Sequence, residues 1–385
     1  GELADGENVF EFSADPVGTG KLLLCGNADG TQPEVHLTVY TLPEEGFIDA
    51  PVPATWETYE PDETGRGKYV DFDGVGWYRR NIELDENGGG YHALRFGGVD
   101  YYCEVWYDGL YLGSHEGGYA EFSLDIEPLF PDRPYSGELV VRVTDQSFDI
   151  NDRFYIKETP AGFLQDTIGM NYAGIWQPVS IDKITGVAVC DLFPLPNVKD
   201  EMVELRVRLK NISPKPCEVT LYADVTGDDT ERKAKSLVTV RSFDYAETTI
   251  EIDMRGCRLW EAGSPFLYNA AVTAESNGEK LTGTSARFGM RSLETSGTEV
   301  LFNGSRLVLT GVLDWLFNFD IFSPAISPER FRSDLQKMRD AGFNSVKYCL
   351  VIPPEYMLDI HDEMGMYAYI EYPMWYERET PALFR

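Results

Sequence analysis

The sequence predicts three consecutive parts: a β-sandwich, a second and smaller β-sandwich, and a parallel α/β segment. Short runs in which apolar and polar residues alternate fill the chain to about residue 185, and a further set continues to about residue 295. The apolar spacing then changes to that of helices alternating with strands. A chain of 385 residues is long enough for two or three domains, each with its own core.

The first part contains a clear hairpin signal in GGVDYYCEVWYDGLYLGSHEGGYAEFSLDI, residues 97–126. Asp108-Gly109 lies between two alternating runs, and this dipeptide readily adopts the positive φ angles of a two-residue turn. With the runs VHLTVY, GWYRRNIEL, YHALRFG and ELVVRVTD, it predicts a sandwich or jelly roll. Three apolar residues near the end of the segment have the spacing of a half-buried strand: Phe122, Leu124 and Ile126.

The second part has the strand pattern of a small immunoglobulin-like sandwich. Similar alternating strands recur in it at CEVTLYADV, TTIEIDM and LYNAAVTAE. Four apolar residues alternate with charged ones in its first strand: Val203, Leu205, Val207 and Leu209.

The third part begins near residue 300, where helical spacing appears in SPERFRSDLQKMRDAGFNSVKY. Ser327 can cap this helix, Pro328 fits its first position, and Gly342 can end it. The expected strands RLVLTGVL, SVKYCLVI and MYAYIEY alternate with it and with a second helix, PPEYMLDIHDEMG, which Gly365 closes. This order of strand, helix, strand, helix and strand is typical of a parallel α/β domain.

The α/β segment is short for a closed domain. A closed eight-stranded barrel takes about 250 residues, whereas only residues 300–385 are available here. Three parallel strands would also leave edges that need cover. We expect either the front part of a longer protein or a domain smaller than its element order suggests, and we favour the first.

Composition excludes two classes of partner. The 64 acidic residues outnumber the 33 basic ones, and the formal net charge of −31 repels nucleic acid phosphates and anionic lipid headgroups. No apolar run approaches the length of a membrane span, and the chain opens at Gly1 without a basic and then apolar leader. We expect no nucleic acid and no membrane partner. The compartment stays open, with a cytoplasmic location favoured.

Cysteine and histidine usage predicts neither disulfides nor a metal site. The six cysteines contain no C-x-x-C pair, so free and mostly buried thiols are expected. The four histidines lie far apart, and His115-Glu116 is not followed by the second histidine of a zinc-protease motif. No metal and no cofactor are therefore predicted.

Seven segments together carry a resemblance to a known family: VGWYRRNIEL, LRFGGVDYYCEVWYDGLYLGSHEGGYAEFSLDI, NYAGIWQPVSI, WEAGSPFLYNAAV, FGMRSLE, FNGSRLVLTGV and MRDAGFNSVKY. In this order the chain resembles glycoside hydrolase family 2, which includes β-galactosidases, β-glucuronidases and β-mannosidases. The resemblance covers nearly the whole chain. It implies a jelly-roll sugar-binding domain over residues 1–185, an immunoglobulin-like β-sandwich over 186–295, and over 296–385 the first βαβαβ part of a TIM (β/α)8 barrel.

The resemblance implies a retaining exo-β-glycosidase that hydrolyses terminal β-linked sugars by double displacement. Such chemistry needs two carboxyl groups about 5–5.5 Å apart, one an acid/base and the other a nucleophile. In the family these glutamates follow the fourth and seventh barrel strands, and both positions lie beyond residue 385. No catalytic residue is therefore assigned, and this chain alone is expected to be inactive. The expected partner is a carbohydrate substrate, and family members often form homo-oligomers.

Part of the sugar site is expected in the third part, because barrel chemistry gathers at the carboxyl ends of the strands. The substrate-binding candidates are Asp314 and Trp315 after strand one, and Glu371, Tyr372 and Trp375 after strand three. A carboxylate accepts hydrogen bonds from sugar hydroxyls, and an aromatic face stacks on a pyranose. The alternative for the two tryptophans is that they fill a core or brace a loop.

Three further residues have weaker or open roles. Lys347 and Tyr348, near the end of strand two, are candidates for which a structural role is favoured. Asp166 corresponds to an acidic residue that, in the family, reaches the active site from a jelly-roll loop, and the alternative is a turn-capping Asp. The segment GVLDWLF lacks the Asn-Arg/Lys-His that galactosidases and glucuronidases carry there, so the sugar is not assigned.

An alternative function is a non-catalytic carbohydrate-binding protein. It predicts saturable glycan binding by residues 1–185 alone, unaffected by Asp314→Ala. A plain β-rich adhesion protein, the third possibility, does not explain the βαβαβ segment.

Overall fold

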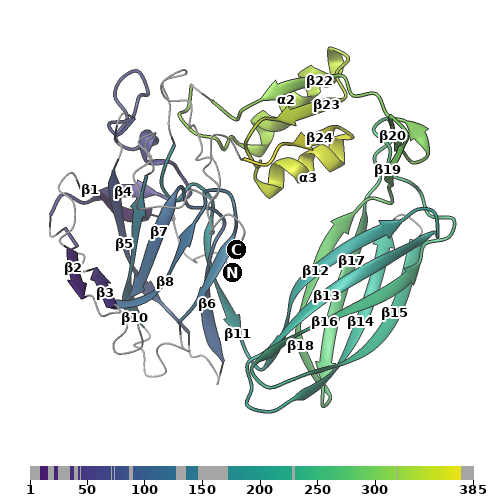
Figure 1. Cartoon of the computed structure of the whole chain (residues 1–385), viewed down its shortest axis with the longest axis horizontal. Helices are drawn as coiled ribbons and strands as arrows, with labels where there is room; N and C mark the ends of the chain where they lie inside the picture. The colour runs from purple at the N-terminus through teal and green to yellow at the C-terminus, as the bar shows by residue number, and fades with distance from the viewer. Residues whose placement is uncertain are drawn as a thin grey trace, which may run out of the picture.

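The computed structural model describes residues 9–15, 21–24, 35–38, 42–43, 45–70, 72, 74–85, 90–126, 136–145, 172–227, 230–318 and 320–373. These residues form two β-sandwiches and an α/β unit, which lies between the sandwiches at the top of Figure 1. The α/β unit contacts both sandwiches through hydrogen bonds, so the three parts form one packed arrangement.

The first sandwich pairs a six-stranded sheet, of order β4-β1-β5-β10-β7-β8, with a three-stranded sheet, of order β11-β6-β9. The strands β2 and β3 form a separate antiparallel pair. The element bounds are β1 Val9–Asp15, β2 Lys21–Leu24, β3 Val35–Thr38, β4 Ile48–Pro51, β5 Val75–Glu83, β6 Tyr91–Phe96, β7 Tyr102–Tyr107, β8 Leu110–Glu116, β9 Phe122–Asp125, β10 Ser136–Thr144 and β11 Val179–Ile184, with a 3-10 turn, η1, at Trp56–Thr58.

The hairpin predicted at Asp108-Gly109 is confirmed. β7 and β8 pair antiparallel with Tyr107 opposite Leu110, and the two turn residues have φ angles of 48° and 80°. Two positive φ angles in succession are what a right-twisted two-residue hairpin requires. Inward-facing residues of β7, such as Val105, are buried against β6 and β10, which gives the first sandwich its own core.

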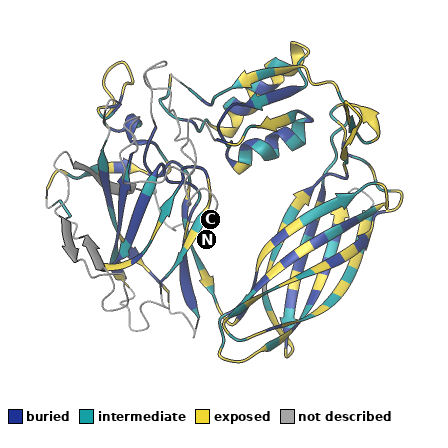
Figure 2. Ribbon diagram, viewed as in Figure 1, coloured by how far each residue is buried: buried dark blue, intermediate teal, exposed yellow. Residues whose placement is uncertain are grey.

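The second sandwich contains seven strands in the order β15-β14-β17-β18-β12-β13-β16. Ladders are antiparallel except for one parallel bridge, Ala188 to Thr282, which joins β12 to β18. Figure 2 shows buried and exposed residues alternating along its strands, and all four apolar residues predicted to face inward on β13 are buried. The bounds are β12 Val187–Asn197, β13 Met202–Asn211, β14 Cys217–Gly227, β15 Thr230–Val240, β16 Asp244–Asp253, β17 Tyr268–Ser276 and β18 Glu279–Phe288.

The α/β unit contains three parallel strands in the order β22-β23-β24. A small three-stranded sheet, β19-β20-β21, precedes it. The bounds are β19 Leu293–Ser296, β20 Glu299–Phe302, β21 Ser305–Arg306, β22 Gly311–Asp314, α2 Pro328–Asp340, β23 Ser345–Tyr348, α3 Glu355–Met364 and β24 Tyr367–Ile370.

The predicted helix signals are confirmed at both ends of α2. The Ser327 hydroxyl accepts a hydrogen bond from the Arg330 backbone N–H, Pro328 occupies the first turn, and Gly342 follows the helix with φ of 91°. Gly365 ends α3 in the left-handed region at φ of 69°. A Cβ atom at Gly365 would lie 2.3 Å from the Ala262 carbonyl oxygen, so only glycine allows this approach to the second sandwich.

The first strand of the α/β unit is shorter than predicted. The run RLVLTGVL was expected to be one strand, but β22 begins only at Gly311. Upstream, the Leu307 N–H donates to Val300 of the small sheet, and the Thr310 N–H donates to the Asn344 side chain. These hydrogen bonds satisfy the backbone N–H groups of Leu307 and Thr310 before the parallel ladder begins.

The cysteines differ from the expectation of mostly buried thiols. All five that the structure describes are free, but only Cys103 and Cys349 are buried, while Cys190 is exposed. Within the described ranges, no cluster of three or more His, Cys, Asp or Glu residues has a geometry that could hold a metal ion. No helix among those ranges is long and apolar enough to cross a membrane.

The core of the α/β unit extends into the first sandwich. Its buried residues join aromatic residues of the first sandwich in one hydrophobic cluster, which includes Tyr172, Trp176, Leu316, Phe331 and Leu335. Since both sides lose water-accessible apolar surface there, the cluster stabilises the contact as well as the unit itself.

The α/β unit also docks onto the second sandwich. Trp260 of that sandwich is buried, and its indole N–H donates to the Asp362 carbonyl oxygen of α3 at 2.7 Å. The Trp260 ring makes an edge contact with Tyr367 at the start of β24. The position of β24 therefore depends on the second sandwich.

Candidate functional site

The carboxyl edge of the parallel sheet brings together three of the predicted site residues, namely Asp314, Trp315 and Glu371. Asp314, Tyr348 and Ile370 are in register at the ends of their strands. Two backbone bonds continue the ladder past these ends, from Cys349 N–H to Asp314 C=O at 2.9 Å and from Glu371 N–H to Tyr348 C=O at 3.0 Å. Asp314, Trp315 and Glu371 therefore lie along one edge.

The two faces of this sheet are very different. On one face, Val346 and Tyr348 are 1% and 0% exposed because α2 and α3 cover them. On the other face, Leu313 and Tyr369, which flank Lys347 in the register, are 50% and 55% exposed. We call the second one the open face. Because side chains alternate along a strand, residues two apart share a face.

Glu371 and Lys347 form an ion pair on the open face. The Lys347 ammonium lies 3.3 Å from Glu371 Oε2, and it also lies over the Tyr369 ring, 5.7 Å from its centroid. Glu371 has a pKa below its usual range, because the Cys349 thiol donates to its carboxylate and Lys347 lies beside it. Burial, reinforced by Glu371, raises the pKa of Cys349 to about 11. Glu371 is thus an ionised acceptor.

Asp314 belongs to the helix-covered face, in register with the buried Tyr348. Its Oδ1 accepts a hydrogen bond from the Leu316 N–H at 2.8 Å, so the carboxylate closes the turn that follows β22. Burial raises the pKa of Asp314 despite these backbone donors. Leu316 has a φ of 55°, a value that costs energy for a leucine and that the Asp314 bond helps to stabilise.

Trp315 lies beside the open face and is linked to the first sandwich through the ring of Phe317. It packs against Cys349 and Leu350, and its ring stacks on Phe317 with centroids 5.9 Å apart. The Phe317 ring in turn contacts Tyr172 of the first sandwich, at 6.2 Å. The first sandwich therefore contributes to the surroundings of the candidate site.

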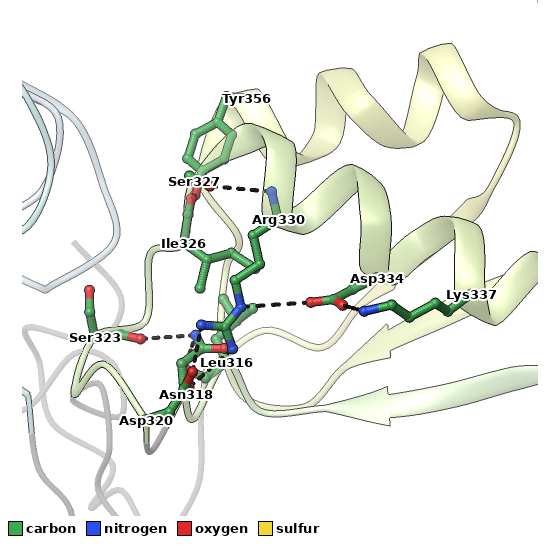
Figure 3. Close-up of polar contacts among 10 residues, drawn as sticks. All are labelled: Leu316, Asn318, Asp320, Ser323, Ile326, Ser327, Arg330, Asp334, Lys337 and Tyr356. Atoms are coloured by element: carbon green, nitrogen blue, oxygen red, sulfur yellow. Dashed lines mark hydrogen bonds and ion pairs between the residues drawn. The ribbon is translucent and has the colours of Figure 1, made fainter.

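Hydrogen bonds and an ion pair hold the described parts of the loop after β22, residues 315–318 and 320–327 (Figure 3). Arg330 makes two bonds to the Asp320 carboxylate, at 2.8 and 3.0 Å, and Asn318 donates to the Ser323 carbonyl oxygen at 2.9 Å. From the first sandwich, the Thr55 hydroxyl donates to the Phe322 carbonyl oxygen at 2.7 Å. The planar guanidinium of Arg330 matches the carboxylate of Asp320, so this pair and the two backbone contacts fix the described residues on either side.

Tyr348 has a structural role, as the sequence favoured. Its side chain is fully buried, and its hydroxyl lies 2.8 Å from His361 Nε2 of α3. Burial raises the pKa of Tyr348, which therefore stays protonated. The other predicted residue of β23, Lys347, instead faces the candidate site.

Two predicted residues, Asp166 and Trp375, lie outside the described residues, and their roles stay predictions. One residue at the edge was missed from the sequence. Cys349 contacts Glu371, and the available signal was its spacing, because it is two residues after Lys347 and so shares the open face.

Comparison with family models gives two matches. Residues 52–184 match the model described as the sugar binding domain of glycosyl hydrolases family 2. Residues 187–291 match a second model, described as glycosyl hydrolases family 2. The two matches follow each other along the chain and fall on the first and second sandwiches.

The curated relatives are glycosidases of more than one specificity. The β-galactosidase large subunit of Leuconostoc lactis is 25% identical over 302 residues, which cover 77% of this chain and 45% of the relative. A β-glucuronidase of Bacteroides fragilis is 23% identical over 338 residues, which cover 84% of this chain and 46% of the relative. The chain thus spans less than half the length of these relatives.

Solved structures share the fold. A GH2 β-galacturonidase from Eisenbergiella tayi, bound to galacturonate, superposes with a TM-score of 0.73 at 21% identity, covering 95% of this chain and 56% of that one. A β-glucuronidase of Bacteroides uniformis superposes with a TM-score of 0.69, also at 21% identity, covering 97% and 44%.

Proposed function

This chain belongs to glycosyl hydrolases family 2, and from that premise we propose that it is part of a retaining exo-β-glycosidase that hydrolyses terminal β-linked sugars. The curated relatives named β-galactosidase and β-glucuronidase support a glycosidase. Activity is proposed for the whole protein, because the chain spans less than half of those relatives.

In this proposal the three parts are a jelly-roll sugar-binding domain (1–185), an immunoglobulin-like sandwich (186–295) and the first strands of a TIM barrel (296–385). The asymmetry of the parallel sheet supports the last assignment. Helices cover one face, while Leu313 and Tyr369 stay exposed on the other, as on strands that line the inside of a barrel. Parallel strands are normally buried on both faces, so the open face fits the interior of a larger domain.

The observation that carries the proposed site is the meeting of Glu371 and Trp315 at the carboxyl edge of this sheet. Glu371 accepts hydrogen bonds from sugar hydroxyls, and Trp315 offers an aromatic face to the pyranose. Asp314 supports the site because its carboxylate closes the turn that carries Trp315. We also propose that Asp314 contacts the sugar. Asp166 and Trp375 are proposed as further sugar contacts.

The chemistry in this proposal follows the double displacement of retaining enzymes. One carboxylic acid protonates the leaving oxygen while a carboxylate attacks the anomeric carbon, and water then releases the sugar from the glycosyl-enzyme. These two glutamates are proposed to lie outside this sequence. The residues described here bind and orient the sugar, which places its anomeric carbon for the reaction.

The test is turnover of aryl β-glycosides by the natural protein that contains this sequence, with the anomer of the first product identified by NMR. We expect hydrolysis with retained configuration. The 385-residue chain alone is expected to show none. Glycan binding without turnover by the natural protein would instead support the non-catalytic alternative.

A pair of variants tests the site. Glu371→Ala is expected to lower kcat/KM by roughly tenfold or more, since a charged hydrogen bond to substrate is lost. Glu294→Ala is the control, because this residue of β19 is exposed and far along the chain from the edge. Equal kcat/KM values in both variants would remove Glu371 from the site.

A further inference from the structure

We propose that a proton on Glu57 couples the first sandwich to the α/β unit. The neutral Glu57 acid donates to the Thr55 hydroxyl, and this hydroxyl in turn donates to the Phe322 carbonyl oxygen of the α/β unit. The coupling is independent of the proposed glycosidase activity, because it needs no substrate. It makes the contact between the two parts sensitive to pH.

Glu57 lies in the η1 turn of the first sandwich and is enclosed there. The residue is 2% exposed, and its neighbour Thr55 is 0% exposed. The Glu57 carboxyl accepts a hydrogen bond from the Ala173 backbone N–H, which lies 3.1 Å from Oε1 and 3.3 Å from Oε2. Burial disfavours the charged form of a carboxyl group, so a neutral acid fits this position.

Among the described residues, the titratable groups around Glu57 are one acid and three phenols. Asp145, which follows β10, is buried and carries a like charge. Tyr59, Tyr78 of β5 and Tyr172 are buried, and burial is the main cause that raises the pKa of each. Any charge on Glu57 adds to these rises. Burial first, and Asp145 next, raise the pKa of Glu57 well above its usual value, although backbone hydrogen bonds oppose the shift.

Thr55 connects Glu57 to the α/β unit through a hydroxyl that has a single proton to donate. Its oxygen lies 2.7 Å from the Phe322 carbonyl oxygen, which can only accept. The same hydroxyl is a hydrogen-bonding neighbour of the Glu57 carboxyl. Because the Thr55 proton is directed to Phe322, Thr55 can only accept from Glu57. The bond between the two side chains therefore needs a proton on Glu57.

Ionisation of Glu57 changes where the Thr55 proton goes. A carboxylate only accepts, so it competes with the Phe322 carbonyl oxygen for this one proton. Hydrogen bonds to a charged group are about twice as strong as neutral ones, so the Thr55 hydroxyl turns to Glu57. Phe322 then loses its donor from the first sandwich. The affected turn is marked by the Ile321 and Phe322 N–H groups, which both donate to the Asn318 carbonyl oxygen.

The first experiment detects the proton itself. Infrared spectra of the natural protein that contains this sequence are compared with those of its Glu57→Gln variant at pH 7. The difference should show the C=O stretch of a neutral carboxylic acid, present in the wild type and lost in the variant. Glutamine keeps the shape, donates to Thr55 as the neutral acid does, and accepts from the Ala173 N–H, so the variant should fold. A difference spectrum without this band would overturn the proposal.

The second experiment follows urea unfolding against pH in the same two proteins. An unfolded glutamate titrates near ~4.3, so a raised pKa means that the folded state holds its proton to higher pH. The resulting stabilisation is complete below the unfolded pKa and is lost as pH rises through the folded pKa. Relative to Glu57→Gln, the wild-type unfolding equilibrium constant should rise by up to about tenfold per pH unit in that window. Parallel pH profiles for the two proteins would contradict the proposal.

A pair of Thr55 variants tests the connection to the α/β unit. Thr55→Val removes the hydroxyl and should speed hydrogen exchange at the Ile321 and Phe322 amides, whereas Thr55→Ser keeps the hydroxyl and should keep their protection. In the wild type, these amides should lose protection as the neutral-acid band disappears with rising pH, and they should keep it in Glu57→Gln. Unchanged exchange in Thr55→Val would show that Glu57 holds a proton without coupling the two parts.

Discussion

The second sandwich and the α/β unit bury their apolar residues in different ways. On β13 of the sandwich, Val203 and Leu205 are fully buried in a cluster made entirely from residues 187–290. In the α/β unit, Leu335 is equally buried, but its cluster includes Tyr172 and Trp176 of the first sandwich. The sandwich encloses its own core, whereas the α/β unit shares one.

This difference has a functional consequence. The residues proposed to contact sugar lie on the part whose stability depends on its neighbours, and Trp260 and the first sandwich both hold that part in place. Substitutions in the sandwich core should therefore stay local. Substitutions at the contacts should spread into the candidate site.

The largest effect is expected from Trp260→Ala. It removes the indole bond to Asp362 and the ring contacts with Phe302 and Tyr367, and it should lower the free energy of unfolding by about 4 kcal/mol. Hydrogen exchange should show lost protection in α3 and β24. Phe243→Ala, at a turn residue that is 72% exposed, is the control. Unchanged protection of α3 would show that this contact does not stabilise it.

Leu205→Ala should be nearly as destabilising, by about 3 kcal/mol, because it leaves a cavity in the second sandwich. Its effect should be confined to the strands of that sandwich, with α3 keeping its protection from hydrogen exchange. The exposed neighbour Arg206→Ala should change the urea midpoint very little. If α3 loses protection together with β13, the contrast between the two parts is wrong.

Acid should weaken the α/β unit through His361. Burial lowers the pKa of His361 to about 4, whereas an unfolded histidine titrates near ~6.5. The unfolded state therefore takes up the proton first, so stability falls as pH drops from about 6.5 toward 4, by about 2 kcal/mol at pH 5.

The check is urea unfolding at pH 7 and pH 5 with two variants. His361→Gln should lose most of this pH dependence, while Tyr348→Phe, which removes the hydroxyl 2.8 Å from His361 Nε2, should keep it. An equal slope in His361→Gln and the wild type would assign the acid sensitivity to other groups.

The smallest effect is expected from Arg287→Gln. Arg287 of the second sandwich pairs with Asp359 at 2.7 Å and with Glu363 at 2.5 Å on α3. These partners are partly exposed, so the change should cost less than about 1 kcal/mol and should disappear at high salt. A larger loss that persists in high salt would mean that these ion pairs, rather than Trp260, hold α3 in place.

Elements whose signals are local could be predicted from the sequence. Asp108-Gly109 specifies its hairpin because the turn geometry depends on two residues alone. Ser327 and Pro328 specify the start of α2 for the same reason. The alternation on β13 predicts its buried face because the sandwich encloses that face itself.

Features that depend on distant partners could not be predicted. The start of β22 at Gly311 depends on Asn344, more than 30 residues later. The side chain of Asp314 lies on the face of the sheet that α2 and α3 cover, and the sequence does not show which face that is. Its position next to Trp315 in the sequence therefore did not reveal that its carboxylate closes the turn after β22. The pairing of Lys347 with Glu371 depends on the register between β23 and β24.

The shared cluster of the first sandwich and the α/β unit also limits how such proteins can recombine. Trp176 and Phe331 belong to one core although 155 positions (331 − 176) separate them in the chain. A chimera that took the first sandwich from one relative and the α/β unit from another would place two unmatched surfaces together. Successful exchanges should therefore carry both sides of this cluster, and the second sandwich between them offers the freer crossover points.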